Sequence, residues 1–278
     1  MLGKLFRLEM KQSSKFSLTI IGLQLISVIL ASSAFSFISL DLFSSSSEDR
    51  DMAAIFLVMG LIIVIVASLL VMTFTPLIMQ VYHAYRYYKL FTSNGYLMFT
   101  LPCTKSQLFL SKFFTCLLWT VMNFITFFIS IGIFVATVIK HITGGISLKE
   151  AGYYFNQFIT NIKRAMEESG TNFNAIVITY VLMMVVSMLF SIASYYFAIS
   201  IGQLFNKHKL VACIGAYFGI YTIFQMISTV LSVVMAIVIE ANGNYEITYI
   251  PVNIIMSIFA ISGLVGSYFI MKNKLNLE

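Results

Sequence analysis

The chain has 278 residues, of which 59% are hydrophobic and only 10% are charged, and its formal net charge is +6. An ordinary soluble domain is about 45–50% apolar and about 25% charged. A soluble fold of this length could not bury so much apolar surface, so the composition excludes soluble enzymes and disordered proteins and predicts a lipid environment.

The N-terminal segment, residues 1–15, carries four basic residues at helical spacing: Lys4, Arg7, Lys11 and Lys15. This pattern predicts an amphipathic interfacial helix whose basic face contacts anionic lipid in the inner leaflet. A basic flank that only orients the first span is a compatible alternative. Glu9 falls among the apolar positions and needs a partner. A signal peptide is rejected because the apolar stretch that follows is longer than the roughly 7–15 residues of a signal h-region.

Six stretches reach the length of about 20 mostly apolar residues that a transmembrane helix needs. They are residues 16–40, 53–81, 113–139, 175–204, 210–239 and 250–271. Backbone groups in hydrocarbon must be hydrogen-bonded internally, and the alternating pattern of a membrane barrel is absent, so we expect helices. The predicted fold is an all-α integral membrane protein in which residues 1–278 form a single transmembrane domain.

Charge predicts the orientation of these spans. The N-terminus, the 2–3 loop, the 4–5 loop and the C-terminus together carry twelve basic and two acidic residues, whereas the other side carries five basic and nine acidic residues. The positive-inside rule therefore places both termini in the cytoplasm. The basic character thus reflects membrane topology, and no nucleic-acid partner is expected. Cys103, Cys116 and Cys213 then lie toward the reducing side and are expected to be free thiols.

The 2–3 loop contains an exposed apolar piece in a cytoplasmic segment. Asn94-Gly95 predicts a turn, residues 96–101 are mostly apolar, and Pro102 ends the piece. Thr104 and Gln107 match a capping box, which predicts that a new helix starts there and continues into the third span. An apolar patch of this kind either folds back on the membrane or is covered by a partner protein.

The outer 3–4 loop has a second capping box, Ser147 and Glu150, followed by apolar residues at helical spacing. It predicts an amphipathic helix at the outer surface. Packing on the membrane surface is favoured over a role as a substrate lid.

Polar side chains inside the spans are the candidates for a substrate path. They are Gln24 and Ser27 in the first span and Tyr221, Gln225, Ser228 and Thr229 in the fifth. For Gln225, pore lining and interhelical hydrogen bonding are both open. Small residues spaced four apart, at Gly215/Gly219, Ser262/Gly266 and Gly263/Ser267, predict close helix packing. Pro76 could kink the second span.

Catalytic chemistry is missing from the sequence. There is no HExxH motif, no GxxxxGK[ST] loop to hold ATP phosphates, and no charged residue in the middle of a span. We therefore expect no enzyme activity and no bound cofactor in this chain, so either energy for transport comes from a partner or the protein is passive.

The stretch from Tyr85 to Lys112, YRYYKLFTSNGYLMFTLPCTKSQLFLSK, closely resembles the cytoplasmic 2–3 loop of ABC-2-type transporter permeases from Gram-positive bacteria. The N-terminal MLGKLFRLEMK is similar to the start of the same family. The resemblance extends over the whole chain in its predicted topology. The part that is specific to the family in sequence is about 40 residues long.

The resemblance implies a separate ATPase subunit, which would bind ATP and Mg, and a homo- or heterodimer of permeases in the bacterial cytoplasmic membrane. The residues that it assigns to ATPase coupling are Gly95, Tyr96, Leu97, Met98 and Phe99, with a second contact at Lys207 and His208. The family often has an acidic residue before the glycine, but this chain has Asn94 there. Whether a salt bridge to the ATPase forms at that point is therefore open.

We therefore expect the membrane subunit of an ABC exporter, whose substrate is an antimicrobial peptide, a lipid or a drug. An ATP-independent channel, immunity or sensor protein is the first alternative. A membrane-embedded enzyme is the second, and it lacks a catalytic set.

Overall fold

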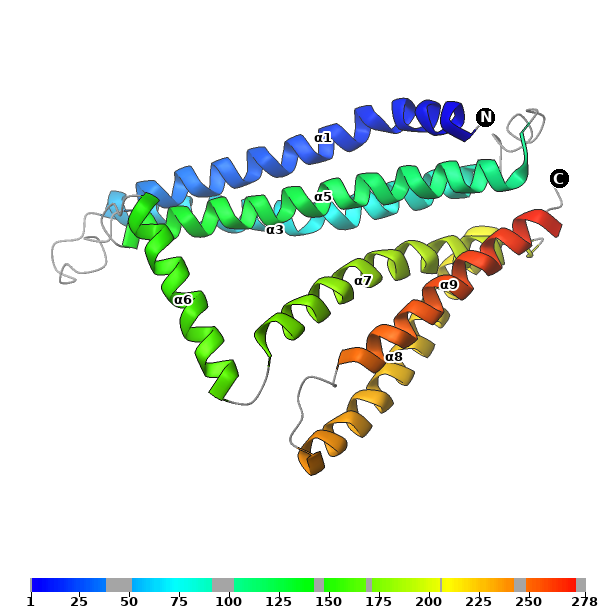
Figure 1. Ribbon diagram of the computed structural model, residues 1–278. Coiled ribbons are helices and arrows are strands. Elements are labelled where there is room, and N and C mark those ends of the chain that lie inside the picture. The colour runs from blue at the N-terminus through cyan, green and yellow to red at the C-terminus, as the bar shows by residue number, and fades with distance from the viewer. Residues whose placement is uncertain are drawn as a thin grey trace. The chain divides into compact units, whose positions relative to one another are not determined.

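The computed structural model describes residues 2–38, 52–91, 103–142, 148–168, 172–205, 207–242 and 249–273 (Figure 1). These residues form seven α-helices, and no strand occurs among them. The helices are α1 (Leu2–Phe37), α3 (Met52–Lys89), α5 (Lys105–Ile142), α6 (Leu148–Glu168), α7 (Phe173–Gly202), α8 (Lys209–Asn242) and α9 (Tyr249–Asn273). The all-α fold class is confirmed.

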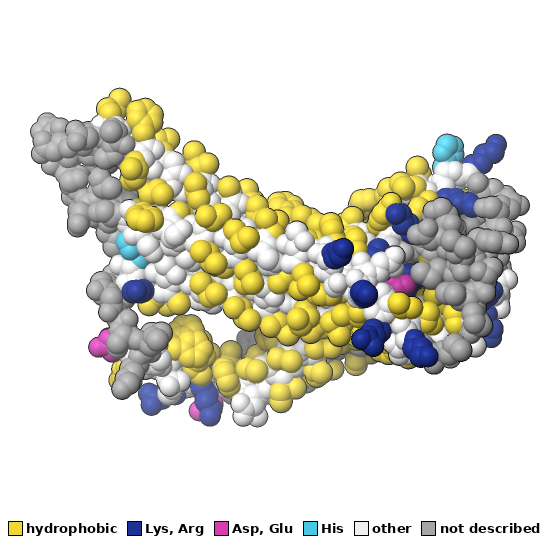
Figure 2. All heavy atoms as spheres, turned by 90° about the horizontal axis from the view of Figure 1, so that it is seen from above, with side chains coloured by type: hydrophobic (Ala, Val, Ile, Leu, Met, Phe, Trp, Pro, Cys, Tyr) yellow, Lys and Arg dark blue, Asp and Glu magenta, His cyan; other side chains and the backbone are white. Residues whose placement is uncertain are grey.

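Every helix except α6 is long and apolar enough to cross a membrane, which gives the six predicted spans. Hydrophobic side chains cover most of the described surface on the face drawn in Figure 2. Such a surface is stable in lipid but not in water, because lipid tails are themselves apolar. The chain is therefore a multi-pass membrane protein.

The helices extend beyond the predicted spans. The first helix runs without interruption from Leu2 to Phe37, so the predicted interfacial segment and the first span share one helix. At the start of α5, the backbone N–H of Gln107 donates to Thr104 Oγ1 over 3.4 Å, so the predicted helix start at Thr104 is confirmed together with one of the two hydrogen bonds of a capping box. Between the third and fourth spans, α6 confirms the predicted helix.

The chain divides into two compact units. Unit 1 consists of Met1–Glu9, Tyr82–Leu117 and Phe155–Glu278, and unit 2 consists of Met10–Val81 and Leu118–Tyr154. The long helices α1, α3 and α5 contribute residues to both units.

Unit 2 packs parts of α1, α3 and α5 around a small core of Ile20, Met79 and Trp119. The indole Nε1–H of Trp119 donates to Ser13 Oγ over 3.0 Å, so the only tryptophan of the chain is both packed and hydrogen-bonded. The contact joins α1 to α5.

Pro76 lies inside α3, where the helix continues through it. Proline lacks the N–H that would otherwise bond the carbonyl of Met72, four residues earlier. The buried hydroxyl of Thr75 donates to that carbonyl oxygen over 2.8 Å. The neighbouring threonine therefore supplies the hydrogen bond that proline removes, and this allows proline inside a membrane helix.

In unit 1, α7 packs against both α8 and α9. The ring of Phe190 lies 4.3 Å from the ring of Phe224, and the Phe224 ring lies 5.7 Å from that of Phe259, measured between centroids. A Cβ placed on Gly263 would lie 3.4 Å from the Cβ of Ala193. Small residues on α9 therefore allow close approach to α7, as the spacing predicts.

The GxxxG pair of α8 behaves differently. A Cβ placed on Gly215 or Gly219 meets no heavy atom within 4 Å among the described residues. The predicted close packing is therefore found for Gly263 and Gly266 of α9 but not, within the described chain, for this pair.

Gly202, the last residue of α7, gives a test of this packing. A Cβ there would lie 2.7 Å from the backbone nitrogen of Cys213 and 2.8 Å from its Cα. We expect Gly202→Ala to lower the free energy of unfolding by about 1–3 kcal/mol, because backbone atoms have to move. The measurement is thermal unfolding of the purified protein in detergent. The matched control, Gly215→Ala, should unfold at the wild-type temperature or above it. Equal unfolding temperatures for the two variants would contradict the packing.

Candidate functional site

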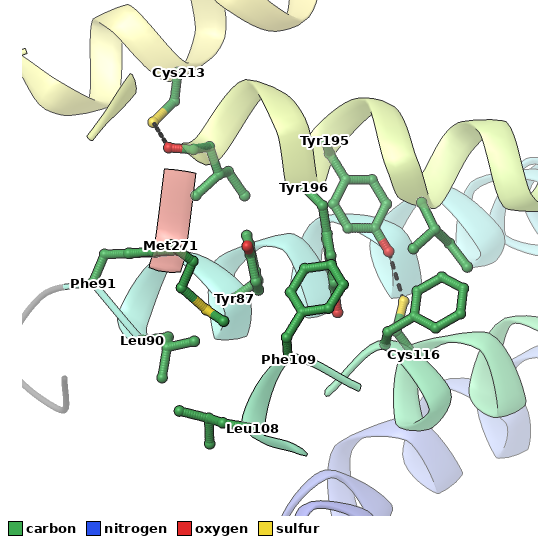
Figure 3. Packing of buried hydrophobic residues seen from close by; sticks show 13 residues of the cluster. Tyr87, Leu90, Phe91, Leu108, Phe109, Cys116, Tyr195, Tyr196, Cys213 and Met271 are labelled. Carbon is green, nitrogen blue, oxygen red and sulfur yellow. Dashed lines mark hydrogen bonds between the residues drawn. The ribbon is translucent and has the colours of Figure 1, made fainter. Parts of the chain in front are cut away.

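The two helix ends that flank residues 92–102 lie in the largest hydrophobic core of unit 1 (Figure 3). Tyr87 lies in the last turn of α3 and Leu90 directly follows that helix, whereas Leu108 and Phe109 lie in the N-terminal part of α5. All four side chains are buried, which is unusual for residues so close to a connecting segment. The predicted coupling segment is therefore bounded by well-packed ends.

Aromatic contacts join these ends to α7. The rings of Tyr87 and Tyr196 are stacked, with centroids 3.9 Å apart and planes 5° from parallel. Phe109 meets Tyr196 edge to face at 5.9 Å. The hydroxyl groups of Tyr87 and Ser200 share a hydrogen bond of 3.1 Å, so the buried phenol has a partner. The core thus links α3, α5 and α7 through directional contacts.

The C-terminal part of α9 joins the same core. Met271 is fully buried within it, and the ring of Tyr268 lies 6.0 Å from that of Phe109. Lys105 Nζ donates to the carbonyl oxygen of Lys272 over 2.9 Å. A cation at this position satisfies a free carbonyl and interacts favourably with the negative end of the α9 dipole.

Of the residues predicted for ATPase coupling, Gly95, Tyr96, Leu97, Met98 and Phe99 lie outside the described residues. Lys207 and His208 are described, and both are exposed in the short connection between α7 and α8. His208 adopts a left-handed backbone conformation with φ of 56°, and its carbonyl oxygen accepts from the N–H of Ala212 over 3.0 Å, at the start of α8. Lys207 therefore presents a positive charge on the surface just before the start of α8.

An ion cluster in unit 1 joins α1, α3 and α5. Arg86 Nη2 donates to Glu9 Oε2 over 2.6 Å, and Lys112 Nζ donates to Glu9 Oε1 over 2.8 Å. The Glu9 residue is only 5% exposed. The sequence predicts that this carboxylate needs a partner, and the structure gives it two. They are Arg86 and Lys112, which lie 77 and 103 positions further along the chain.

A small cavity lies beside the ion cluster. It is lined by Glu9, His83, Arg86, Tyr87, Lys112, Thr115 and Tyr196. His83 is only 4% exposed, and its Nε2 atom has no hydrogen-bond partner among the described residues. Sequence reasoning did not single out His83. The only signal was its position within the aromatic and basic run at the end of the second span.

The candidate path residues of the first span lie in unit 2. Gln24 is fully buried, and its Oε1 accepts from Asn123 Nδ2 over 3.3 Å, across from α5. The hydroxyl of Ser27 donates to the carbonyl oxygen of Leu23 on its own helix over 2.8 Å. Gln24 thus makes an interhelical hydrogen bond, and its partner Asn123 was missed although it is a polar amide in mid-span.

The candidate path residues of the fifth span lie in unit 1 on α8. Tyr221 is 50% exposed, Gln225 and Thr229 are exposed, and Ser228 is partly buried. Thr229 donates to the Gln225 carbonyl oxygen over 2.8 Å. These four residues belong to unit 1, whereas Gln24 and Ser27 of α1 belong to unit 2.

Comparison of the chain with protein-family models, with curated proteins and with solved structures finds no match.

The ion cluster is tested by removing its single negative charge. Glu9→Gln would leave Arg86 and Lys112 buried without a counter-charge, and we expect it to destabilise the protein by about 3–5 kcal/mol. The measurement is thermal unfolding in detergent. The matched control is Glu168→Gln, which makes the same change at an exposed site and should have little effect.

A double-mutant cycle separates the ion pair from general destabilisation. Combining Glu9→Gln with Lys112→Gln should cost less stability than the sum of the two single changes, because each single change leaves the other charge unpaired. Additive effects would show that Glu9 and Lys112 do not interact.

Proposed function

We propose that the chain is the membrane-spanning permease subunit of an ATP-driven ABC exporter in the bacterial plasma membrane. The observation that supports this most is the burial of the two helix ends that flank residues 92–102. Both flanking helix ends are buried in the core that also holds α7 and α9. A partner that moves the segment would therefore move several spans together, since packed cores deform little.

The apolar character of the segment supports a protein partner at this position. Tyr96, Leu97, Met98 and Phe99 follow one another between Gly95 and Pro102. Burial of one large apolar side chain contributes about 1.5–3 kcal/mol, so two or three anchors are enough to hold a subunit. The exposed turn at Lys207 and His208 is the second contact in this proposal.

The partner supplies the chemistry that the sequence lacks. ATP and Mg would bind to a separate ATPase subunit, and a second permease would complete the transport path. Gln225, exposed on α8, is a polar group at a membrane-spanning position, and a dimer interface or a transport path would give it polar partners. Peptide, lipid and drug substrates are all compatible with these features.

The test is ATPase coupling in the complex that copurifies with the tagged full-length chain. Phe99→Asp should leave the chain in the membrane but weaken ATPase association and abolish substrate-stimulated ATP hydrolysis, because a carboxylate would enter an apolar groove. The readouts are copurification of the ATPase and ATP turnover after reconstitution, with and without candidate substrate.

The matched control is Phe158→Asp, which makes the same substitution at an exposed position of α6. It should retain ATPase association. Full association and full stimulation in Phe99→Asp would refute the coupling role. Absence of any ATPase from the purified complex would favour the ATP-independent channel or sensor.

A further inference from the structure

We propose that the cavity beside Glu9 binds an oxygen atom of an anionic phosphate group, and that the headgroup of an anionic phospholipid is its source. All residues of this site belong to unit 1. The proposal does not depend on an ATPase partner.

The first argument is charge. Arg86 and Lys112 bring two positive charges to the cavity, and Glu9 brings one negative charge that both of them share. The Glu9 carboxylate also lines the cavity, but each of its oxygens already accepts an N–H from a cation. The cluster therefore keeps an excess positive charge in a buried place, where a counter-ion is favoured strongly.

The second argument is the supply of hydrogen-bond donors. An ammonium group has three N–H donors, but among the described residues Lys112 Nζ has one acceptor, Glu9 Oε1. His83 lines the same cavity, and its buried Nε2 has no partner in the described chain. Buried polar groups without partners are costly. The remaining Lys112 N–H groups, together with His83 Nε2 in the tautomer that carries its proton there, can donate to an acceptor atom from outside the chain.

The third argument is size and surroundings. The enclosed part of the cavity has room for about one water-sized atom, and it opens to the surface. One phosphate oxygen can enter while the rest of the group stays outside. Leu8 and Tyr85, the sequence neighbours of Glu9 and Arg86, are 64% and 53% exposed, and Lys4 and Arg7 are exposed basic residues on the same part of α1. Apolar and basic surface together suit a lipid headgroup at the edge of a membrane.

The experiment uses the full-length protein in phosphatidylcholine vesicles that contain a trace of spin-labelled phosphatidylglycerol or spin-labelled phosphatidylcholine. Electron paramagnetic resonance gives the relative association constant of each labelled lipid. Wild type should prefer the anionic lipid. Lys112→Gln and His83→Phe should each reduce that preference, by up to about tenfold for loss of a charge-assisted hydrogen bond. His83→Phe leaves the ion cluster intact, so it reports on the site even where Lys112→Gln disturbs folding.

The matched control is Lys140→Gln, which removes one positive charge from an exposed position near the other end of α5 and should keep the preference. In a second arm, inorganic phosphate is added. Failure to displace the labelled phosphatidylglycerol supports a lipid source, whereas displacement that Lys112→Gln abolishes supports the same anion site with free phosphate as its ligand.

Two results would overturn the proposal. One is a wild-type protein without anionic preference that also binds no inorganic phosphate. The other is an equal loss of preference in Lys140→Gln and in both cavity variants, which would mean that surface charge alone attracts the lipid.

Discussion

The buried carboxylate of Glu9 is the constraint on which this end of the protein depends. An ion removed from water costs several kcal/mol unless other charges and hydrogen bonds compensate it. Arg86 and Lys112 provide that compensation from two other helices, over 2.6 and 2.8 Å. The start of α1 is therefore tied to the end of α3 and the start of α5. The stacked rings of Tyr87 and Tyr196 then extend the same packing to α7.

The six spans could be predicted from the sequence, because an uncharged apolar stretch of this length is rarely anything but a transmembrane helix. The start of α5 could be predicted as well, since Thr104 and Gln107 form a local capping signal. The ends of the helices could not be predicted in the same way. Past residue 81, α3 continues to Lys89 through polar and aromatic residues, which a hydropathy criterion for spans leaves out. A helix continues as long as its residues permit helical backbone geometry. At the polar end of α3, tertiary contacts bury several of these residues.

The site is less predictable than the fold. That Glu9 needs a partner follows from its position among apolar residues, but the choice of Arg86 and Lys112 from twelve basic residues on the predicted inner side depends on tertiary packing. The pairing of Gln24 with Asn123 depends on register between α1 and α5 in the same way. The coupling role of Gly95–Phe99 is an expectation from the resemblance alone, and these residues lie outside the described residues.

The proposed ATPase contact requires that the helix ends flanking residues 92–102 face the cytoplasm. The most direct measurement is labelling with a membrane-impermeant thiol reagent. Cys116 and Cys213 are buried and Cys103 is partly exposed, so Cys103 is the natural reporter of this side. We predict that Cys103 reacts only after cells are permeabilised, and that a Ser46→Cys variant lacking Cys103 reacts in intact cells. The reverse pattern would contradict the orientation and, with it, the proposed ATPase contact.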